Sequence, residues 1–317
     1  MALLEVQHIS KQFTNGLLIN DINFKQEALQ KIAIAGASGA GKTTLLKMIS
    51  GHTQPTNGTI FFDDKRVIGP DEKLMPGHKH IGYLSQYYEL LPHYRVEELI
   101  WFENKLDEDA ANKLFEICRI SQLLKRKTDQ LSGGEKQRIS LCMLLVKSPK
   151  MLVLDEPFSN LDLIHTNTLK DVLEDITNEL KITCLLTSHD PHDTLSWADE
   201  IIVMKDGTII QQGTPEEIYN KPINEYTAGL FGRYNLLKSK QAGMFGIASN
   251  GNDVLMRPEH FTIAATGTGI KGIINKLRYQ GNFYEAEVLI EDDAKIYVRI
   301  LNNDWKAGKK VFVNLNV

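Results

Sequence analysis

The stretch GASGAGKTT at residues 36–44 constrains the fold of this chain more than any other feature. It spaces its glycines, lysine and threonine as Gly-x4-Gly-Lys-Thr, after an apolar run at 32–35 that predicts a buried strand and at the start of a predicted helix. At this spacing, glycines let consecutive backbone N–H groups converge on an anion at a helix N-terminus. The stretch therefore predicts a phosphate-binding loop that holds a nucleotide.

The side chains of this loop have distinct expected tasks. We expect Lys42 to reach the β and γ phosphates of the nucleotide and the Thr43 hydroxyl to hold Mg²⁺. The nucleotide-binding residues expected from the loop are Gly36, Ser38, Gly39, Ala40, Gly41, Lys42, Thr43 and Thr44.

The composition favours a globular protein of two domains in a reducing cytosol. The chain has 317 residues, 42% of them hydrophobic, and its net charge of −4 gives no overall basic field, so we expect no nucleic-acid partner. Cys118, Cys142 and Cys184 lie far apart among apolar residues and are expected to fill the core. We find no signal-peptide pattern and no apolar run long enough to span a membrane.

Two further apolar runs predict an α/β core. The runs at 151–154 and 182–186 are continuous, as expected for strands buried on both faces of a parallel sheet. The residues between them with helical spacing are Leu169, Val172, Leu173, Ile176 and Leu180. From 95 to 127 we expect a mostly helical insert, in which Asp107 caps a helix. The apolar face of that helix is formed by Ala110, Ala111, Leu114, Phe115 and Cys118.

The C-terminal part of the chain predicts a small β domain. The stretch 238–252 is rich in Gly, Ser, Asn and Gln, which indicates a linker. Alternating apolar residues then follow at 284–290, 296–300 and 311–315, with Glu285 and Glu287 in the polar positions of the first run. The domain is large enough for one five-stranded barrel of the OB kind.

Two more segments carry groups suited to nucleotide chemistry. Asp155 and Glu156 follow the run at 151–154, at the strand end where open α/β sheets bind ligands. One carboxylate could serve Mg²⁺ and the other could face a water, although an acid pair that only caps a helix is the alternative reading. The Ser-Gly-Gly sequence at 132–134 opens a helix and could bind a second anion, or could be an ordinary cap.

In their order, these motifs resemble the ATP-binding subunits of ATP-binding-cassette (ABC) transporters. The matching motifs are Walker A at 36–44, Gln86, the signature at 131–135, Walker B at 151–155 with Glu156, the D-loop at 159–162 and the switch histidine His189. The resemblance covers residues 1 to about 215 and implies an α/β P-loop NTPase core with a helical insert at about 88–148. The expected domains are the ATPase at 1–232, a linker at 233–251 and an OB-like barrel at 252–317.

The resemblance also implies roles for individual residues. The expected catalytic residues are Glu156, which polarises the attacking water, together with His189, Gln86 and Lys42. The expected Mg²⁺ ligands are Thr43, Gln86 and Asp155. The expected contacts to ATP outside the phosphate loop are Phe13, Ser132, Gly133, Gly134 and Asp162. Phe13 either stacks on adenine or is an ordinary aromatic near an N-terminal hairpin. Glu135 departs from the glutamine common in the family, so no role is assigned to its side chain.

The resemblance implies a second copy of the chain as a partner, because in this family the phosphate loop and the signature of different subunits bind the same ATP. The segment Val254–Glu259 and the strands after it look like the transport-associated OB (TOBE) domain of importer ATPases. Uptake driven by ATP is therefore expected, with integral membrane subunits and, indirectly, an extracytoplasmic binding protein as partners. The expected location is the cytoplasm, on the inner face of the membrane.

Alternatives to import remain at this point. A soluble ABC ATPase that acts on nucleic acid or ribosomes is one, and an ATPase for efflux or lipoprotein release is another. The cargo stays open among metal ions, polyamines, oxyanions and sugars.

Two surface features also have competing interpretations. The apolar residues Tyr87, Tyr88, Leu90 and Leu91 pack into the insert or receive a helix of a membrane subunit. His78 and His80 are too few to make a metal site, so we expect a solvated loop.

Overall fold

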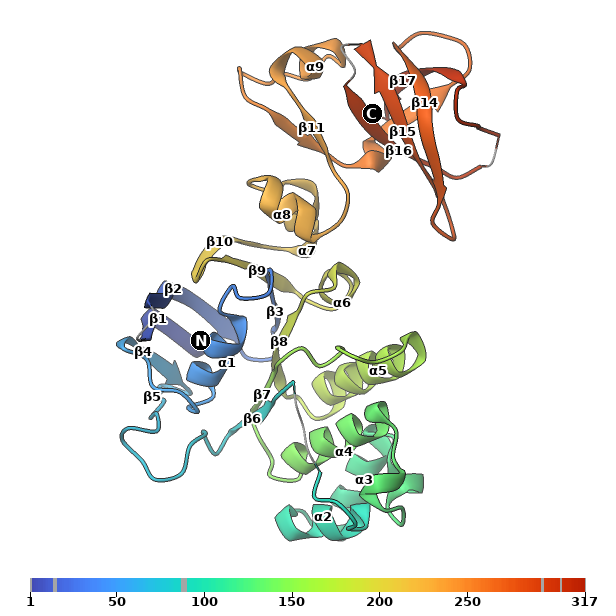
Figure 1. Cartoon of the computed structure of the whole chain (residues 1–317). Helices are drawn as coiled ribbons and strands as arrows, with labels where there is room; N and C mark the ends of the chain where they lie inside the picture. The colour runs from blue at the N-terminus through green and yellow to red at the C-terminus, as the bar shows by residue number, and fades with distance from the viewer. Residues whose placement is uncertain (1, 14–15, 87–89, 292–293, 303, 317) are drawn as a thin grey trace. The chain divides into compact units, whose positions relative to one another are not determined.

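The computed structural model describes residues 2–316 except 14–15, 87–89, 292–293 and 303. The chain forms two compact units, Met1–Pro215 and Glu216–Val317 (Figure 1). Among the residues that the structure describes, no helix is both long and apolar enough to cross a bilayer.

The first unit is built on a six-stranded sheet. Its strands, in spatial order, are β10 (Thr208–Gly213), β9 (Glu200–Lys205), β3 (Lys31–Ala35), β8 (Thr183–Ser188), β7 (Met151–Leu154) and β6 (Ile81–Leu84). All neighbouring pairs are parallel except β10 with β9. Every residue of β7 and β8 is buried, as expected for strands covered on both faces of a parallel sheet. The predicted parallel α/β core is confirmed.

A second, antiparallel sheet lies in the same unit. Its order is β2 (Gly16–Glu27), β1 (Ala2–Phe13), β4 (Asn57–Phe62) and β5 (Lys65–Arg66). Helix α1 (Lys42–Ile49) buries Leu45, Leu46, Met48 and Ile49 in one apolar core with residues of both sheets. This packing fixes the start of α1, and with it the phosphate loop, at the C-terminal end of β3.

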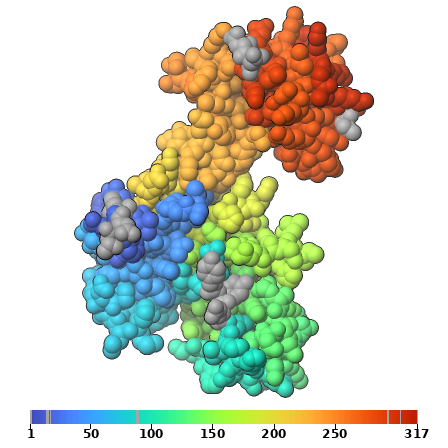
Figure 2. All heavy atoms as spheres, viewed as in Figure 1, coloured from blue at the N-terminus to red at the C-terminus, as the bar shows by residue number. Residues whose placement is uncertain are grey.

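The remaining helices of this unit include the predicted insert, drawn in teal and green in Figures 1 and 2. They are α2 (Val96–Glu103), α3 (Glu108–Ile117), α4 (Gly133–Leu145), α5 (Leu163–Glu179) and α6 (Pro191–Leu195), with 3-10 turns at Ser121–Leu123 and Thr128–Gln130. Asp107 caps α3 by accepting a hydrogen bond from the N–H of Ala110 at 2.8 Å, as predicted. Ala110 itself is exposed, so its place on the apolar face was wrong, since it lies in the solvent-facing first turn.

The second unit is a five-stranded antiparallel barrel with short flanking elements. The barrel order is β13 (Phe261–Ala264), β17 (Lys310–Leu315), β14 (Ile270–Tyr279), β15 (Tyr284–Ile290) and β16 (Lys295–Ile300). Strand β13 also approaches β16, so the sheet nearly closes on itself. The flanking elements are α7 (Pro215–Asn220), α8 (Glu225–Leu230), β11 (Asn235–Leu237), α9 (Ser239–Met244), β12 (Val254–Met256) and a 3-10 turn at Pro258–His260. The predicted OB-like barrel is confirmed.

The segment expected as a linker has regular structure. Strand β11 pairs with β12, and α9 follows β11. Leu237 and Ala242 are fully buried in the core of the barrel, and the ring of Phe245 meets that of Phe261 edge-on at 5.2 Å. These apolar residues are sparse among polar ones, which is why composition alone suggested a linker. The expected limits of the ATPase domain (1–232) and of the barrel (252–317) remain predictions.

Arg257 explains why α7 and α8 belong to the second compact unit. Arg257 is 2% exposed, and its guanidinium donates to the carbonyl oxygens of Tyr219, Ala228, Gly232 and Arg233 at 2.8–3.3 Å. A single buried cation therefore links α7 and α8 to the start of the barrel.

Two acidic residues of β15 differ from the expected alternation. Glu285 is 8% exposed and Glu287 is 5% exposed, although both were expected to face solvent. Glu285 pairs with Arg233 at 2.9 Å, and Glu287 accepts a hydrogen bond from Asn275 at 2.5 Å. Because polar partners cover this face of the strand, the carboxylates are buried but compensated.

Candidate nucleotide-binding and catalytic site

The phosphate loop needs glycine at two positions for steric reasons. Gly41 caps the N-terminus of α1 with a φ of 98°, a left-handed conformation that favours glycine. A Cβ atom on Gly36 would lie 2.5 Å from the carbonyl oxygen of Met204, which is backbone and cannot move aside cheaply. The loop is therefore held against neighbouring strands, and its N–H groups lead into the positive end of α1.

Lys42 begins the helix and is 6% exposed. Its ammonium group donates to the carbonyl oxygens of Gly36 at 2.7 Å and Ala37 at 3.1 Å. Burial lowers the pKa of Lys42, while the charges of Glu156 and Asp155 act in the opposite direction. The lysine thus lies across the loop, within the field of the two acidic residues.

Asp155 is a buried carboxylate directly after β7, with 2% exposure. Its Oδ1 atom accepts hydrogen bonds from the hydroxyls of Thr43 at 3.1 Å and Thr187 at 3.0 Å. Since Thr43 donates its proton to Asp155, the lone pairs of the threonine oxygen remain available for a cation. A carboxylate and a hydroxyl oxygen placed together are the kind of oxygen ligands that Mg²⁺ takes.

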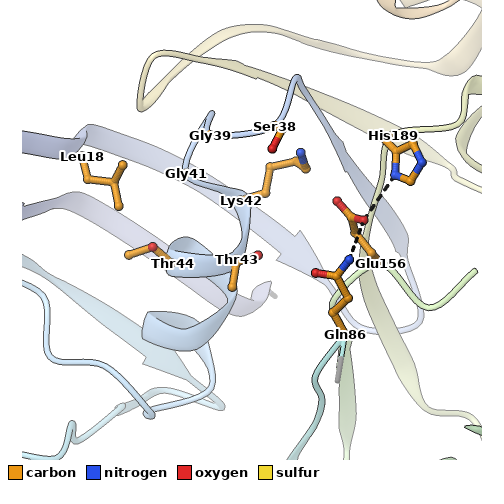
Figure 3. Close-up of a pocket in the computed structure, with 10 residues that line it drawn as sticks. All are labelled: Leu18, Ser38, Gly39, Gly41, Lys42, Thr43, Thr44, Gln86, Glu156 and His189. Carbon is orange, nitrogen blue, oxygen red and sulfur yellow. Dashed lines mark hydrogen bonds and ion pairs between the residues drawn. The ribbon is translucent and has the colours of Figure 1, made fainter. Parts of the chain in front are cut away.

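Glu156 occupies a strained backbone position between Asp155 and the following turn. Its φ of 47° is unusual for a residue other than glycine, and its N–H donates to Thr187 Oγ1 at 2.9 Å. The side chain turns to two polar groups: Gln86 Nε2 donates to Oε2 at 3.3 Å, and His189 Nδ1 lies 3.2 Å from the same oxygen. Figure 3 shows these three side chains converging from three different segments of the chain.

A cavity of about 560 Å³ joins the phosphate loop to this acidic group (Figure 3). Its lining residues are Leu18, Ser38, Gly39, Gly41, Lys42, Thr43, Thr44, Gln86, Glu156 and His189. All of them except Leu18 were expected as site residues. Leu18 has no chemical group that a motif could identify, and it reaches the cavity because β2 packs beside the loop.

The other expected nucleotide contacts do not line this cavity. Phe13 is 47% exposed at the end of β1, with the ammonium of Lys11 5.2 Å from its ring centre. Ser132, Gly133 and Gly134 start helix α4, and Asp162 caps α5.

The signature segment is ordered by a reciprocal cap. Ser132 Oγ accepts a hydrogen bond from the N–H of Glu135 at 3.3 Å, and the carboxylate of Glu135 accepts one from the N–H of Ser132 at 2.8 Å. Burial would raise the pKa of Glu135, but these hydrogen bonds, together with the charges of Arg126 and Arg138, outweigh it and leave the pKa lowered. Glu135, to which the sequence assigned no role, thus completes a capping box.

The D-loop and the signature helix meet through His165. Asp162 Oδ1 lies 2.8 Å from His165 Nδ1, and the imidazole packs so close to Gly134 that a Cβ there would lie 2.6 Å from His165 Cδ2. Sequence reasoning missed His165, as well as Thr187 and Tyr83 beside Asp155. His165 and Tyr83 lie outside the motifs, and Thr187, at the start of the segment that carries His189, received no role, because these roles follow from which strands and helices are neighbours.

His78 and His80 are partly buried, whereas we expected them in a solvated loop. The rings of His78 and Phe62 meet edge-on at 5.2 Å, and those of His78 and His80 lie 6.0 Å apart. Within the part of the chain that the structure describes, no group of three or more His, Cys, Asp and Glu side chains is arranged to hold a metal ion.

Comparisons with known proteins agree with this geometry. The ABC transporter family model matches residues 19–159, and the TOBE domain model matches residues 254–317. The chain is 32% identical to the spermidine/putrescine import ATP-binding protein PotA of Bacillus cereus, with 98% of this chain and 96% of that protein covered. It is 31% identical to the protein of the same name from Spiroplasma citri, with 99% and 95% covered.

Solved structures resemble the first part of the chain. CbiO1 of Clostridium perfringens, part of the ABC transporter complex CbiONQ, shares 27% identity with a TM-score of 0.60, covering 68% of this chain and 90% of that one. A nucleotide-free ATP-binding cassette from an ABC transporter shares 26% identity with a TM-score of 0.59, covering 68% and 93%. With its phosphate loop and Glu156 lining one cavity, and Asp155 hydrogen-bonded to Thr43 of that loop, this chain belongs to the ATP-binding subunits of ABC transporters and is an import ATPase with a C-terminal TOBE domain.

Proposed function

We propose that two copies of this chain bind two ATP molecules between them, each held by the phosphate loop of one copy and the segment Ser132–Gly134 of the other. The observation that carries the proposal is the separation of the two motifs within one chain: the signature residues do not line the cavity of the phosphate loop. The start of α4, with its cap at Ser132, provides a positive dipole end for the phosphates of the partner copy.

Within each site, Glu156 is the general base that orients the attacking water. Gln86 and His189 both contact Oε2 of Glu156, so they fix the side chain, and Oε1 would serve the water. The left-handed backbone at Glu156 places its side chain toward the cavity and that of Asp155 toward Thr43. Adjacent carboxylates thereby serve different tasks, one for the water and one for the cation.

The site fits Mg²⁺ together with the phosphates of ATP. Thr43 and Asp155 would hold the cation, with Gln86 at the same side of the cavity. Lys42 would bind the β and γ phosphates, and His189 would contact the γ phosphate. Bound Mg²⁺ neutralises the charge that develops on the phosphate oxygens during phosphoryl transfer.

The helical insert of the first unit is the proposed contact with the membrane subunits. Its described surface includes several large apolar side chains that are well exposed, namely Leu91 (61%), Tyr94 (44%), Trp101 (51%) and Phe102 (81%). Such aromatic residues are common anchors at protein interfaces. Tyr87 and Tyr88, which were expected in the same contact, lie outside the described residues. This contact would hold the chain on the inner face of the membrane.

The proposed cargo is a polyamine of the spermidine and putrescine class, delivered by an extracytoplasmic binding protein. Relatives that carry this name match at 31–32% identity over almost the whole chain, including the TOBE domain. The test is uptake of radiolabelled spermidine by cells whose own copy of this chain is replaced by the wild type or by Glu156→Gln. We expect uptake with the wild type and loss of uptake with the variant at equal protein levels. Equal uptake by both would contradict coupling of ATP hydrolysis to import, and wild-type cells that take up no spermidine would contradict the cargo.

A further inference from the structure

Tyr83 lies beside the proposed magnesium site although it belongs to none of the family motifs. It is the third residue of β6, which runs parallel to β7 with Tyr83 paired to Val153. Side chains two residues apart lie on the same face of a strand, so Asp155 and Tyr83 project from the same side of the sheet. The backbone continues this register, because the N–H of Asp155 donates to the carbonyl oxygen of Leu84 at 2.9 Å.

The hydroxyl of Tyr83 donates to Oδ2 of Asp155 at 3.2 Å. The two threonine hydroxyls of the site both donate to the other oxygen, Oδ1. In the described structure Tyr83 is thus the side-chain donor to Oδ2, and the carboxylate is held at both ends. A carboxylate held only at Oδ1 can rotate about its Cβ–Cγ bond, which would move the oxygen that faces the cation.

The ring of Tyr83 is itself held in place. It contacts the imidazole of His52 with a centroid distance of 5.1 Å, and His52 Nδ1 lies 2.9 Å from Ser50 Oγ. The hydroxyl of Ser50 donates to the carbonyl oxygen of Leu46 at 2.8 Å, so the imidazole N–H donates to Ser50. The end of α1 therefore supports the ring whose hydroxyl orients Asp155.

We propose that Tyr83 is a positioning residue for the magnesium ion: its hydroxyl fixes the orientation of the Asp155 carboxylate and thereby strengthens cation binding in the ATP complex. This inference rests on the proposed ATP and Mg²⁺ site. Residues that hydrogen-bond a metal ligand commonly change metal affinity by tenfold or more when they are removed. The effect falls on the cation and leaves the contacts of the phosphate loop to ATP unchanged.

Tyr83→Phe separates this role from a packing role, because the variant keeps the ring against His52 and loses only the hydroxyl. The measured quantity is the dissociation constant of the full chain for a fluorescent, non-hydrolysable ATP analogue, determined once with Mn²⁺ and once with EDTA. Mn²⁺ takes the same oxygen ligands as Mg²⁺. The ratio of the two constants isolates what the cation contributes. The control is Tyr279→Phe, which removes the hydroxyl of a tyrosine that is 66% exposed in the second unit.

In Tyr83→Phe we expect the affinity gained from Mn²⁺ to fall about tenfold, which corresponds to about 1.4 kcal/mol. The affinity in EDTA should stay within about twofold of the wild type, and the control should change neither value. An unchanged ratio in Tyr83→Phe would overturn the inference. A similar loss of affinity with and without the cation would overturn it as well, since that result indicates a packing role. A wild-type chain that does not bind the analogue would overturn the proposed function itself, so the two failures are distinguishable.

Discussion

His189 Nδ1 lies 3.2 Å from Oε2 of Glu156, at the edge of the cavity that the phosphate loop lines. The two residues come from loops that follow neighbouring parallel strands, β8 and β7, whose C-terminal ends meet at one edge of the sheet. Helix α6 begins at Pro191, two residues after His189, and is capped by Asp190, which accepts a hydrogen bond from the N–H of His192 at 2.8 Å. The pair is thus held by the sheet on one side and by a helix start on the other.

Replacing Glu156 by glutamine should abolish most hydrolysis while keeping ATP binding. The amide is close in size to the carboxylate but cannot accept a proton from water, and a positioned base contributes about 100-fold or more to kcat. We expect kcat to fall by at least that factor and the dissociation constant for ATP to stay within about threefold. Steady-state kinetics and fluorescence titration of the purified chain check both values. Hydrolysis by Glu156→Gln at the wild-type rate would contradict the role of Glu156 as general base.

Gly134→Ala should destabilise the contact between the signature helix and the D-loop. The added Cβ would lie 2.6 Å from His165 Cδ2 and 3.0 Å from His165 Cβ, so the histidine must move and its contact with Asp162 is disturbed. We expect a loss of about 1–3 kcal/mol in unfolding free energy, measured by urea denaturation. Gly133→Ala is the matched control, because a Cβ there meets no atom within 4 Å. Equal losses in the two variants would contradict the packing role of His165.

Arg257→Met should loosen α7 and α8 from the barrel. The substitution keeps an unbranched side chain but removes the guanidinium that donates to the carbonyl oxygens of Tyr219, Ala228 and Arg233. An unsatisfied buried polar group costs about 1–3 kcal/mol, so we expect the second unit to lose at least about 3 kcal/mol. Limited proteolysis should then cut within residues 216–260 before it cuts the first unit.

The control for this experiment is Arg278→Met in the same barrel. Arg278 is partly exposed and approaches Glu285 at 3.6 Å, so its loss should cost less than about 1 kcal/mol. If both arginine variants resist protease like the wild type, Arg257 does not tie these helices to the barrel.

His78 should make the chain less stable in acid. Burial lowers the pKa of His78 to about 4, with the charges of His80, Lys73 and Lys79 adding to the effect, while the ordinary value of 6.5 applies in the unfolded chain. Between these values the unfolded state binds more protons, so stability falls as the pH drops from about 6.5 toward 4. We expect Tm to decrease less between pH 7.5 and pH 5 in His78→Gln than in the wild type.

Thermal scans at both pH values check this difference, with the exposed His192→Gln as the control. His192→Gln should follow the wild-type pH dependence. A His78→Gln variant with that same dependence would show that His78 does not lower stability in acid.

The sequence was most informative where one residue type alone can satisfy a local requirement. Gly36, Gly41 and Lys42 could be identified because a phosphate loop tolerates few substitutions at a fixed spacing. Asp155 and Glu156 could be placed at the sheet edge because β7 is a continuous apolar run that ends at them. In the barrel, alternation predicted the strands, since Val298 and Val313 face its core.

Residues that act through neighbours distant in sequence could not be predicted. Tyr83 and Thr187 contact Asp155 only because β6, β7 and β8 lie side by side in that order. Leu237 buries itself in the barrel through a strand pairing that the polar composition of its segment concealed. Alternation alone predicts that Glu285 faces solvent, because its ion pair with Arg233 joins segments distant in sequence.

The proposed sandwich of two chains is tested most directly by sedimentation velocity of the Glu156→Gln chain with and without Mg·ATP. Because this variant should bind ATP without turning it over, the closed pair of chains should accumulate. We expect a monomer without nucleotide and a dimer with Mg·ATP, and we expect Lys42→Ala in the same background to prevent the dimer. A Glu156→Gln chain that binds ATP and remains a monomer at every concentration would contradict the account.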